Sequence, residues 1–318
     1  MTEELVDLKI GQQVGNWIVE KRLGGGSFGA IYLCKDSKKG GQYALKVEEA
    51  HVIIQLLKME LVVLNELKNS NTRHFCTVED KGREQNFIYI VMTLVGRSLE
   101  DLRISSPQRK FSLGTAISVS IQCLEALQEL HSIGYLHRDV KPGNYTTGRA
   151  EMNELRKIYL LDFGMCRKYI QPDGTIKMPR TQAAFRGTVK YAPLACHLRK
   201  DLCRLDDCES WFYMMIEITK GSLPWRSLNN LDEVGNCKKY CRSRQTEARQ
   251  LFSGCPRDYI QVMRMIDRGY YFDEPKYEEM YSILRKVLKI ACVSVSTKRK
   301  RSIQLIVWEY PYDWELKE

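Results

Sequence analysis

The sequence predicts an α+β fold in two lobes, with a small β-rich lobe followed by a larger helical lobe. Short runs of β-branched and aromatic residues, separated by Gly and by Lys/Asp clusters, occupy the first hundred residues. After Gly96, apolar residues recur at helical spacing instead. A chain of 318 residues is long enough for two domains at roughly 100–200 residues each. We therefore expect an N-lobe over residues 1–95 and a C-lobe over residues 96–318.

The first lobe is predicted to be an antiparallel meander interrupted by one helix. Its expected strands cover residues 17–20, 30–34, 42–47 and 87–92. The helix is expected from about residue 54 to residue 67, because leucines recur there at three- and four-residue spacing, at Leu57, Leu61, Leu64 and Leu67.

The second lobe is predicted to be mainly helical. Its first long helix starts near Ser112, a residue type that caps helix N-termini, and stops at Gly134. Further helical patterns run around residues 207–219, 256–267 and 277–291.

Composition and net charge exclude broad classes of protein without choosing a function. With 44% hydrophobic and 28% charged residues the chain has globular composition, which excludes a disordered or fibrous protein. No window of 18 uninterrupted apolar residues is present, so no membrane-spanning helix is expected. The formal net charge of +10 favours anionic partners, whether nucleic acid, acidic protein or nucleotide phosphate.

The cysteines and the chain ends predict a compartment. The eleven cysteines are scattered, and neither C-x-x-C nor histidines at zinc-site spacing occur. The N-terminal residues lack the basic start and apolar core of a secretory signal. We therefore expect reduced thiols, no structural metal, and a cytoplasmic or nuclear location. The basic run Lys298–Arg301 is interpreted as a solvated loop, with a nuclear localisation signal or a phosphate-binding patch as alternatives.

A glycine-rich segment near the N-terminus has the spacing Gly24-x-Gly26-x-x-Gly29. The same spacing occurs in dinucleotide-binding turns, where the glycines lead into a helix that holds a pyrophosphate. Here they lead into residues 30–34, a predicted strand, so the segment joins two strands. One interpretation is a flexible hairpin whose backbone can lie over phosphates. The alternative is a glycine-rich hairpin without a ligand.

A strand lysine and a helix glutamate form the next candidate pair. Lys46 lies on a predicted strand among apolar neighbours, and Glu60 lies fourteen residues later among the helix leucines. A strand lysine usually points to solvent, but one that faces the interior needs an anion to offset its desolvation. We expect Glu60 to supply that anion, and the pair to hold Lys46 for the α- and β-phosphates of a nucleotide.

A dense charged segment, H-R-D-V-K-P-G-N, follows the first long helix of the second lobe. Within it, Asp139 can accept a proton from a hydroxyl, Lys141 can neutralise a transferring phosphoryl group, and Asn144 can ligate a metal. Asp162 then ends an apolar strand and begins the triplet D-F-G. Carboxylate and amide oxygens together predict a site at Asn144 and Asp162 suited to Mg²⁺ and nucleotide phosphates.

These motifs resemble those of the eukaryotic protein kinases, over nearly the whole chain from about Trp17 to Trp314. The order of glycine loop, strand lysine, helix glutamate, H-R-D and D-F-G matches that family. Within it, the sequence is most similar to the casein kinase 1 group and especially to its tau-tubulin kinase branch. The segments that carry this resemblance are LKME at 57–60, HRDVKP at 137–142, FRGTVKYA at 185–192, DDCES at 206–210, GSLPW at 221–225 and YDWE at 312–315.

The resemblance implies a bilobal protein kinase fold with Mg·ATP between the lobes. Met92 falls where the family has its gatekeeper and Val95 at the hinge, whose backbone would hydrogen-bond adenine. From sequence alone Val95 is only the end of a strand. The implied catalytic residues are Asp139, Lys141 and Asn144, and the implied metal ligands are Asn144 and Asp162. The full set implied to bind ATP is Leu23, Gly24, Gly26, Gly29, Ile31, Ala44, Lys46, Glu60, Met92, Val95 and Asp162.

One departure from the general kinase pattern concerns the A-P-E triplet, which is Ala192-Pro193-Leu194 here. The glutamate that normally pairs with a distant arginine is therefore missing. Casein kinase 1 relatives also lack it, so activity is still expected. Asp207 resembles the structural aspartate that braces the H-R-D backbone; it can also be interpreted as a helix N-cap, and the two roles are compatible.

Substrate recognition is predicted from basic residues. Casein kinase 1 members often favour acidic or already phosphorylated sites, and Lys190 stands where that group has an arginine. Lysine cannot make the bidentate contact of an arginine. Lys238 and Lys239 are aligned with the lysines of the following loop. We expect an anionic substrate residue to dock near Lys190, with solvated surface lysines as the alternative.

The expected activity is transfer of the γ-phosphoryl group of ATP to Ser or Thr hydroxyls of protein substrates by a monomer. Serine/threonine specificity follows from Lys141 two positions after Asp139 and from the resemblance. The group also implies that phosphorylation of Thr181 or Thr188 is not required. A pseudokinase scaffold is the main alternative, although Lys46, Asp139 and Asp162 are all present. A nucleic-acid-binding protein is not expected, because no motif of that class occurs.

Overall fold

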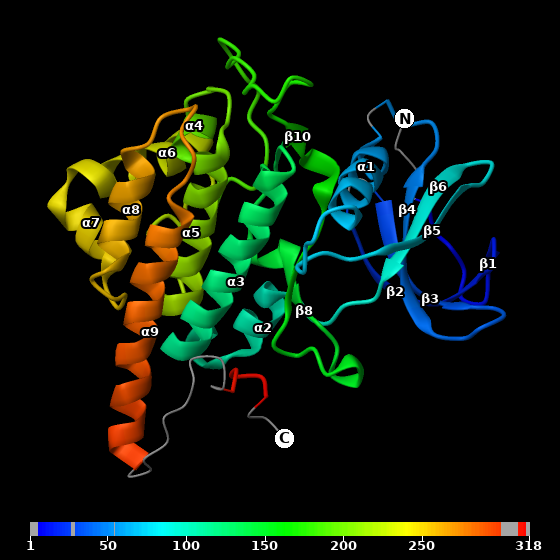
Figure 1. Cartoon of the computed structure of the whole chain (residues 1–318), viewed down its shortest axis with the longest axis horizontal. Helices are drawn as coiled ribbons and strands as arrows, with labels where there is room; N and C mark the ends of the chain where they lie inside the picture. The colour runs from blue at the N-terminus through cyan, green and yellow to red at the C-terminus, as the bar shows by residue number, and fades with distance from the viewer. Residues whose placement is uncertain (1–5, 27–28, 54, 300–310, 316–318) are drawn as a thin grey trace.

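The computed structural model describes residues 6–26, 29–53, 55–299 and 311–315, with backbone alone over residues 291–299. Two lobes lie side by side (Figure 1): a curled sheet with one helix, and a larger group of helices. This is the predicted α+β, bilobal arrangement. Strand β6 ends at Thr93 and helix α2 begins at Leu99, on either side of the division expected between residues 95 and 96.

The N-lobe is an antiparallel sheet in the order β1-β2-β3-β4-β6-β5. The predicted strands are all present. Strand β5 was not predicted, because its sequence VEDKGR alternates half-buried and exposed positions with almost no apolar residues. The strands are β1 (Gln13–Val14), β2 (Trp17–Gly26), β3 (Gly29–Asp36), β4 (Gln42–Glu49), β5 (Val78–Arg83) and β6 (Phe87–Thr93).

The two faces of the sheet belong to different hydrophobic clusters, as the two-residue period of a strand requires. One face, with Leu45, Val47 and Val91, packs against Leu8 and Val14 near the N-terminus. The other face, with Ala44, Ile90 and Met92, packs against α1 (Leu56–Lys68) and joins the C-lobe core. Side chains at alternate positions of β4 therefore point toward the C-lobe.

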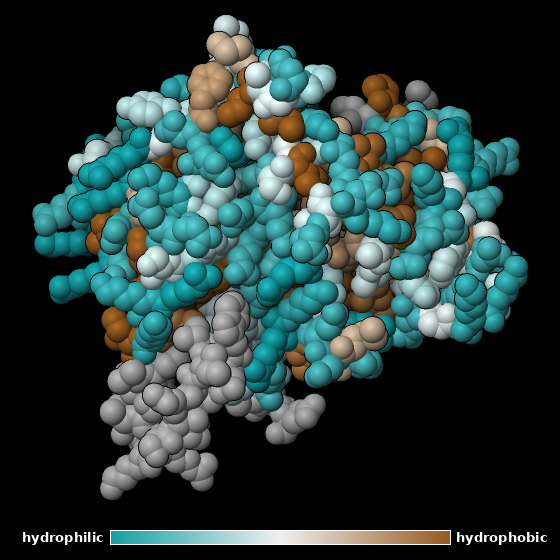
Figure 2. Space-filling view, in the orientation of Figure 1, coloured by the Kyte–Doolittle hydropathy of each residue, from teal (hydrophilic) through white to brown (hydrophobic). Residues whose placement is uncertain are grey.

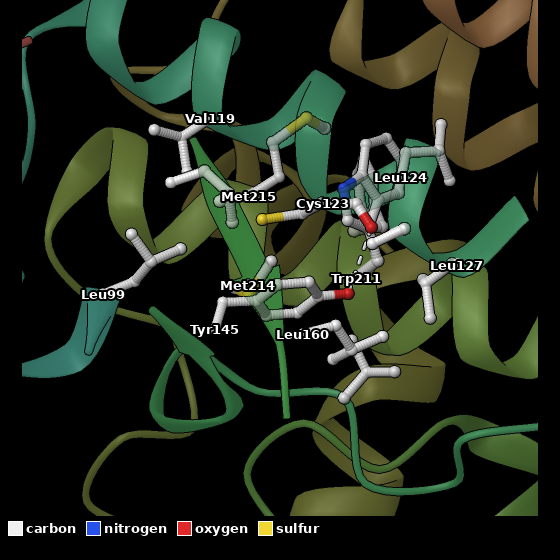
Figure 3. Packing of buried hydrophobic residues seen from close by; sticks show 14 of the residues in the cluster. Leu99, Val119, Cys123, Leu124, Leu127, Tyr145, Leu160, Trp211, Met214 and Met215 are labelled. Atoms are coloured by element: carbon white, nitrogen blue, oxygen red, sulfur yellow. Dashed lines mark hydrogen bonds between the residues drawn. The ribbon is translucent and has the colours of Figure 1, made fainter. Parts of the chain in front are cut away.

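The C-lobe is built around α3 and α5, most of whose residues are buried. Figure 3 shows Trp211, Met214 and Met215 of α5 packed among Val119, Cys123 and Leu124 of α3. The helices are α2 (Leu99–Ser105), α3 (Leu113–Ser132), α4 (Leu194–His197), α5 (Arg204–Lys220), α6 (Leu231–Ser243), α7 (Gln245–Phe252), α8 (Tyr259–Asp267) and α9 (Tyr277–Arg299), and the short strands are β7 (Tyr135–Leu136), β8 (Tyr145–Thr147), β9 (Ile158–Leu160) and β10 (Arg167–Lys168).

Helix α3 begins and ends where the sequence predicts. The Ser112 side chain accepts a hydrogen bond from the backbone of Thr115, and Gly134 follows the helix with φ +86°. Asp313, near the other end of the chain, accepts a hydrogen bond from the Ser112 backbone at 2.6 Å. This carboxylate satisfies a second N–H group at the helix start and ties residues 311–315 to the C-lobe.

Hydrophilic residues cover most of the face seen in Figure 2. Within the described part of the chain, no helix combines the length and the apolar character needed to span a bilayer. The predicted basic run Lys298–Arg301 lies outside the residues whose side chains are described.

Candidate active site

Lys46 and Glu60 form the predicted pair where β4 faces α1. The Lys46 Nζ atom lies 2.5 Å from Glu60 Oε2 and 3.3 Å from Asp162 Oδ1. Burial favours the neutral amine, but the charges of Glu60 and Asp162 outweigh it and raise the pKa of Lys46 above its ordinary value. Lys46 is therefore a fixed ammonium, directed from the N-lobe at the D-F-G aspartate of the C-lobe.

A second glutamate, Glu48 on β4, positions this pair, and sequence reasoning missed it. Glu48 is buried, and its two carboxylate oxygens accept hydrogen bonds from the backbone N–H groups of Leu56 and Leu57 at 2.9 and 3.1 Å. These are the first residues of α1, where N–H groups lack partners within the helix. Glu48 therefore fixes the start of α1 to the strand that carries Lys46.

The residues implied to surround adenine lie on or beside the same sheet face as Lys46. Ile31 is opposite Lys46 in the register of β3 with β4, and Ala44 is opposite Met92 in that of β4 with β6. Cross-strand partners share a face of the sheet. Leu23 on β2 is 46% exposed, and Val95 follows β6 as a partly buried residue of the same core.

The glycine-rich segment joins β2 to β3, as predicted, with Gly26 opposite Gly29 in the register. A side chain cannot be added at Gly29, because its φ is +152° and a Cβ atom there would lie 2.1 Å from the carbonyl oxygen of Val47. The strand that follows excludes the dinucleotide-binding turn, in which a helix would begin.

The carboxylate of Asp139 lies at the centre of the charged turn and is 5% exposed. Lys141 Nζ is 2.6 Å from Asp139 Oδ2, and the amide of Asn144 donates to the Asp139 carbonyl oxygen at 2.9 Å. The hydroxyl and backbone N–H of Thr188 donate to Asp139 Oδ1 at 2.8 and 2.9 Å. Asp139 thus accepts a hydrogen bond from a hydroxyl group while it is paired with a lysine. Sequence reasoning did not identify Thr188 as a residue of this site.

The oxygen donors of Asn144 and Asp162 fit the predicted magnesium site. The backbone N–H of Leu161, next to Asp162, donates to the backbone carbonyl oxygen of Asn144 at 2.9 Å, which brings the two segments together. The Asn144 amide nitrogen is engaged by Asp139, so its amide oxygen is the atom left for a metal. No group of three His, Cys, Asp or Glu side chains suited to a metal occurs among the described residues. Mg²⁺ is usually bound by a few protein ligands together with the phosphates of the nucleotide.

The D-F-G segment is fixed by its phenylalanine. Asp162 has φ +66°, in the left-handed region, while the Phe163 ring is 1% exposed and packs against Phe75 and His137, with ring centroids 5.7 Å away in each case. Burial of that ring offsets the unfavourable backbone at Asp162. The charge of Lys46 also outweighs burial at Asp162 and lowers the pKa of its carboxyl, which keeps it an anion.

Asp207 of α5 braces the H-R-D backbone. Its carboxylate accepts the backbone N–H groups of His137 and Arg138 at 2.7 and 2.9 Å, and the ring of His131 lies 2.9 Å from the same carboxylate. The interpretation of Asp207 as a helix N-cap is wrong, because α5 is capped by Cys203.

The structure contradicts the predicted place of Lys238 in a substrate anion site, and it pairs Lys190 with a carboxylate. Lys238 is fully buried and donates to the carbonyl oxygens of Val189 and Ala192 at 2.8 and 2.7 Å, so it cannot meet a substrate. Lys190 Nζ lies 2.6 Å from the buried carboxylate of Glu217, which offsets its charge. Lys239 is exposed. Neighbouring lysines on a helix face different directions, and no helix was predicted over 231–243.

Glu209 of α5 supplies a carboxylate beside Leu194, the position at which the A-P-E triplet would have its glutamate. The backbone N–H of Leu194 donates to Glu209 at 3.0 Å, and Arg242 Nη2 lies 3.0 Å from the same Oε1 atom. The segment that begins α4 is thus tied to a carboxylate–arginine pair despite the leucine at position 194.

These features are those of a nucleotide-dependent phosphotransferase, and comparison with known proteins agrees. A protein kinase domain model matches residues 17–297. The chain belongs to the protein kinase family. Among its relatives, the serine/threonine-protein kinase spe-6 of Caenorhabditis elegans is 38% identical to this kinase over 272 residues, which cover 84% of this chain and 70% of spe-6.

Two further relatives extend the comparison. A Dictyostelium discoideum protein named as a probable serine/threonine-protein kinase is 34% identical over 303 residues, covering 95% of this kinase and 57% of the relative. A C. elegans protein named provisionally as a casein kinase I is 30% identical over 305 residues, which cover 95% of this kinase and 84% of the relative. The chain therefore spans little more than half the length of the Dictyostelium relative. It carries a serine/threonine protein kinase domain.

Proposed function

We propose that the chain transfers the γ-phosphoryl group of Mg·ATP to Ser or Thr hydroxyls of protein substrates, with casein kinase 1-like character. The observation that carries this proposal is the geometry around Asp139. Its carboxylate binds both the ammonium of Lys141 and the hydroxyl of Thr188. A carboxylate that holds a hydroxyl beside a cation is what in-line phosphoryl transfer requires.

Each residue contributes a separate physical effect. Lys46, fixed by Glu60, offsets the charge of the nucleotide phosphates. Asp139 orients the acceptor hydroxyl and takes its proton, and Lys141 stabilises the charge on the phosphoryl group as it transfers. Most of the rate enhancement then comes from positioning and from preorganised charges.

Asn144 and Asp162 would hold the magnesium ion. When bound, Mg²⁺ supplies charge neutralisation for the nucleotide phosphates. The chain's own contribution is to keep the Asp162 carboxyl ionised beside Lys46 and to hold the amide nitrogen of Asn144 on the Asp139 carbonyl oxygen, so that the amide oxygen is the atom left for the metal.

Two features support serine/threonine specificity and the casein kinase 1 group. Lys141 lies on the Asp139 carboxylate, where it meets a short hydroxyl such as that of Thr188. The relatives named above are serine/threonine kinases, and one carries the name casein kinase I.

We also expect transfer without phosphorylation of the segment that contains Thr181 and Thr188. Arg138, next to Asp139, donates to the carbonyl oxygen of Met165 at 2.7 Å, so its guanidinium is used within the protein. Further along the segment, Asp201 pairs with Arg167 and, at 2.9 Å, with Arg180. A protein carboxylate therefore already holds Arg167 and Arg180.

The test compares serine, threonine and tyrosine versions of one peptide, with labelled ATP and Mg²⁺. We expect transfer to the serine and threonine peptides but not to the tyrosine peptide. Asp139→Asn should lower kcat by roughly 10²–10³-fold, since it removes the charged acceptor for the hydroxyl proton. Equal rates for Asp139→Asn and wild type, or equal transfer to tyrosine, would contradict the proposal.

A further inference from the structure

Among the lysines whose side chains the structure describes, Lys238 is the most fully buried one that the proposed mechanism does not use. It extends from α6 into the C-lobe and is 0% exposed. Its three ammonium hydrogens have three acceptors: Val189 O at 2.8 Å, Ala192 O at 2.7 Å and His197 Nε2 at 3.1 Å. The other ring nitrogen of His197 lies 3.0 Å from Leu231 O, so it carries the proton and leaves Nε2 free to accept.

Aromatic rings complete this site. The Nζ atom lies 5.1 Å from the centroid of Tyr213 and 5.2 Å from that of Trp225. A desolvated ammonium is attracted by such ring faces. Burial lowers the pKa of Lys238 to about 7, and the three acceptors stabilise the ammonium form because each of its hydrogens has a partner. The position of the Lys238 ammonium is therefore determined by its contacts, which include the carbonyl groups of Val189 and Ala192.

Those carbonyl groups belong to the loop 188–192, whose first residue, Thr188, contacts the proposed catalytic aspartate, Asp139. Thr188 binds Asp139 Oδ1, and Val189 and Ala192 follow it. Two more carbonyl groups of the loop, those of Thr188 and Lys190, also have partners within the protein. Thr188 O accepts the backbone N–H groups of Tyr191 and Ala192 at 2.9 Å, and Lys190 O accepts the indole N–H of Trp225 at 2.8 Å.

We propose that Lys238 is a positioning residue for phosphoryl acceptors: from beneath the loop 188–192 it fixes the backbone that places Thr188 against Asp139 and lies beside the bound substrate peptide. The inference rests on the proposed kinase function and names what orders its acceptor site. A single ammonium joins the two ends of the turn, Val189 and Ala192, so its loss frees both ends at once. The indole of Trp225 holds only the middle of the turn.

The test uses Lys238→Met, which keeps the length of the side chain and removes its donors. The matched control is Lys289→Met, which changes an exposed lysine on α9. We expect kcat/KM for a serine peptide to fall roughly 10- to 100-fold in Lys238→Met, because the loop and Thr188 are displaced from Asp139. The KM for ATP should stay that of the wild type, since Lys46 and Glu60 lie in the other lobe.

Amide hydrogen exchange provides a readout that does not depend on activity. The amides of Thr188, Tyr191 and Ala192 are hydrogen-bonded within this arrangement. Their exchange should accelerate in Lys238→Met and remain unchanged in Lys289→Met. Trp225→Phe removes one donor to the same loop and should produce the same changes to a smaller extent, which keeps the test valid if Lys238→Met folds poorly.

The outcomes separate this inference from the proposed function. If wild type phosphorylates the peptide while Lys238→Met and Trp225→Phe match it in kcat/KM and in exchange, the inference is wrong and the kinase proposal stands. If peptide and ATP parameters of Lys238→Met worsen equally, Lys238 is only a general stabiliser and the inference is again wrong. If wild type transfers no phosphate, the proposed function fails, and faster exchange in Lys238→Met would still support the role of Lys238 in ordering the loop.

Discussion

At the scale of single residues, the contacts that each charged side chain makes with its neighbours determine which of them can face a nucleotide. Glu48 is two positions beyond Lys46 and so lies on the same side of β4. Lys46 forms an ion pair with Glu60, while the Glu48 carboxylate accepts hydrogen bonds from backbone N–H groups at the start of α1. The sequence motif identified the lysine and its partner. It could not identify Glu48, because a glutamate in a strand carries no signal of the helix terminus that it caps.

Glu48→Gln should weaken both the fold and the reaction. Removing the charge and one acceptor at the start of α1 should lower the free energy of unfolding by about 1–2 kcal/mol. It should also lower kcat, because Glu60 moves with α1. Denaturant unfolding and peptide phosphorylation measure the two effects. Glu49→Gln, on the opposite side of β4, is the control, and equal effects of the two changes would refute the role assigned to Glu48.

At the scale of elements, α5 connects the core of the C-lobe to the catalytic turn. Its apolar residues Trp211, Met214 and Met215 pack in the centre of the lobe (Figure 3). Near its first turn, Asp207 holds the backbone of His137 and Arg138. The rigidity of the core is therefore transmitted to Asp139 through one carboxylate.

Asp207→Asn should destabilise the protein by about 2 kcal/mol or more, because buried N–H groups lose a charged acceptor. Burial favours the neutral acid, but the hydrogen bond and charge of His131 outweigh it and lower the pKa of Asp207. A depressed pKa adds stability that is present above the ordinary pKa of an aspartate, about 3.9, and is lost in acid below it. The stability difference between wild type and variant should therefore be full at pH 7 and shrink as the pH falls below about 4. Urea unfolding across this range tests it, and a difference that grows in acid would contradict it.

Periodicity predicted the elements with a strong apolar face and missed the polar ones. Helix α3 was predicted with its N-cap Ser112 and its terminal Gly134. Helix α6 was not, because its sequence LDEVGNCKKYCRS has few apolar residues and its burial depends on tertiary contacts. The wrong assignment of Lys238 follows from this, since only a helix shows which of two adjacent lysines faces inward.

At the scale of the whole molecule, the site is assembled from segments far apart in the chain. Lys46 and Asp162 are separated by 116 positions and meet at 3.3 Å. Periodicity was sufficient to predict the two lobes, and the motifs predicted the pair of Lys46 with Glu60 but not the contact of Lys46 with Asp162. The pairing of Lys190 with Glu217 could not be predicted, because it depends on how α5 packs beneath the loop 188–192.

The most direct test of the account is phosphate transfer from labelled Mg·ATP to casein, measured for phosphatase-treated wild type and for Asp162→Asn in parallel. We predict transfer by the wild type that disappears in the variant, since Asp162 is the carboxylate that contacts Lys46 and that we propose as a ligand of the metal. Absence of transfer by the wild type, while ATP still raises its Tm, would contradict the account and favour a scaffold that binds nucleotide without catalysis.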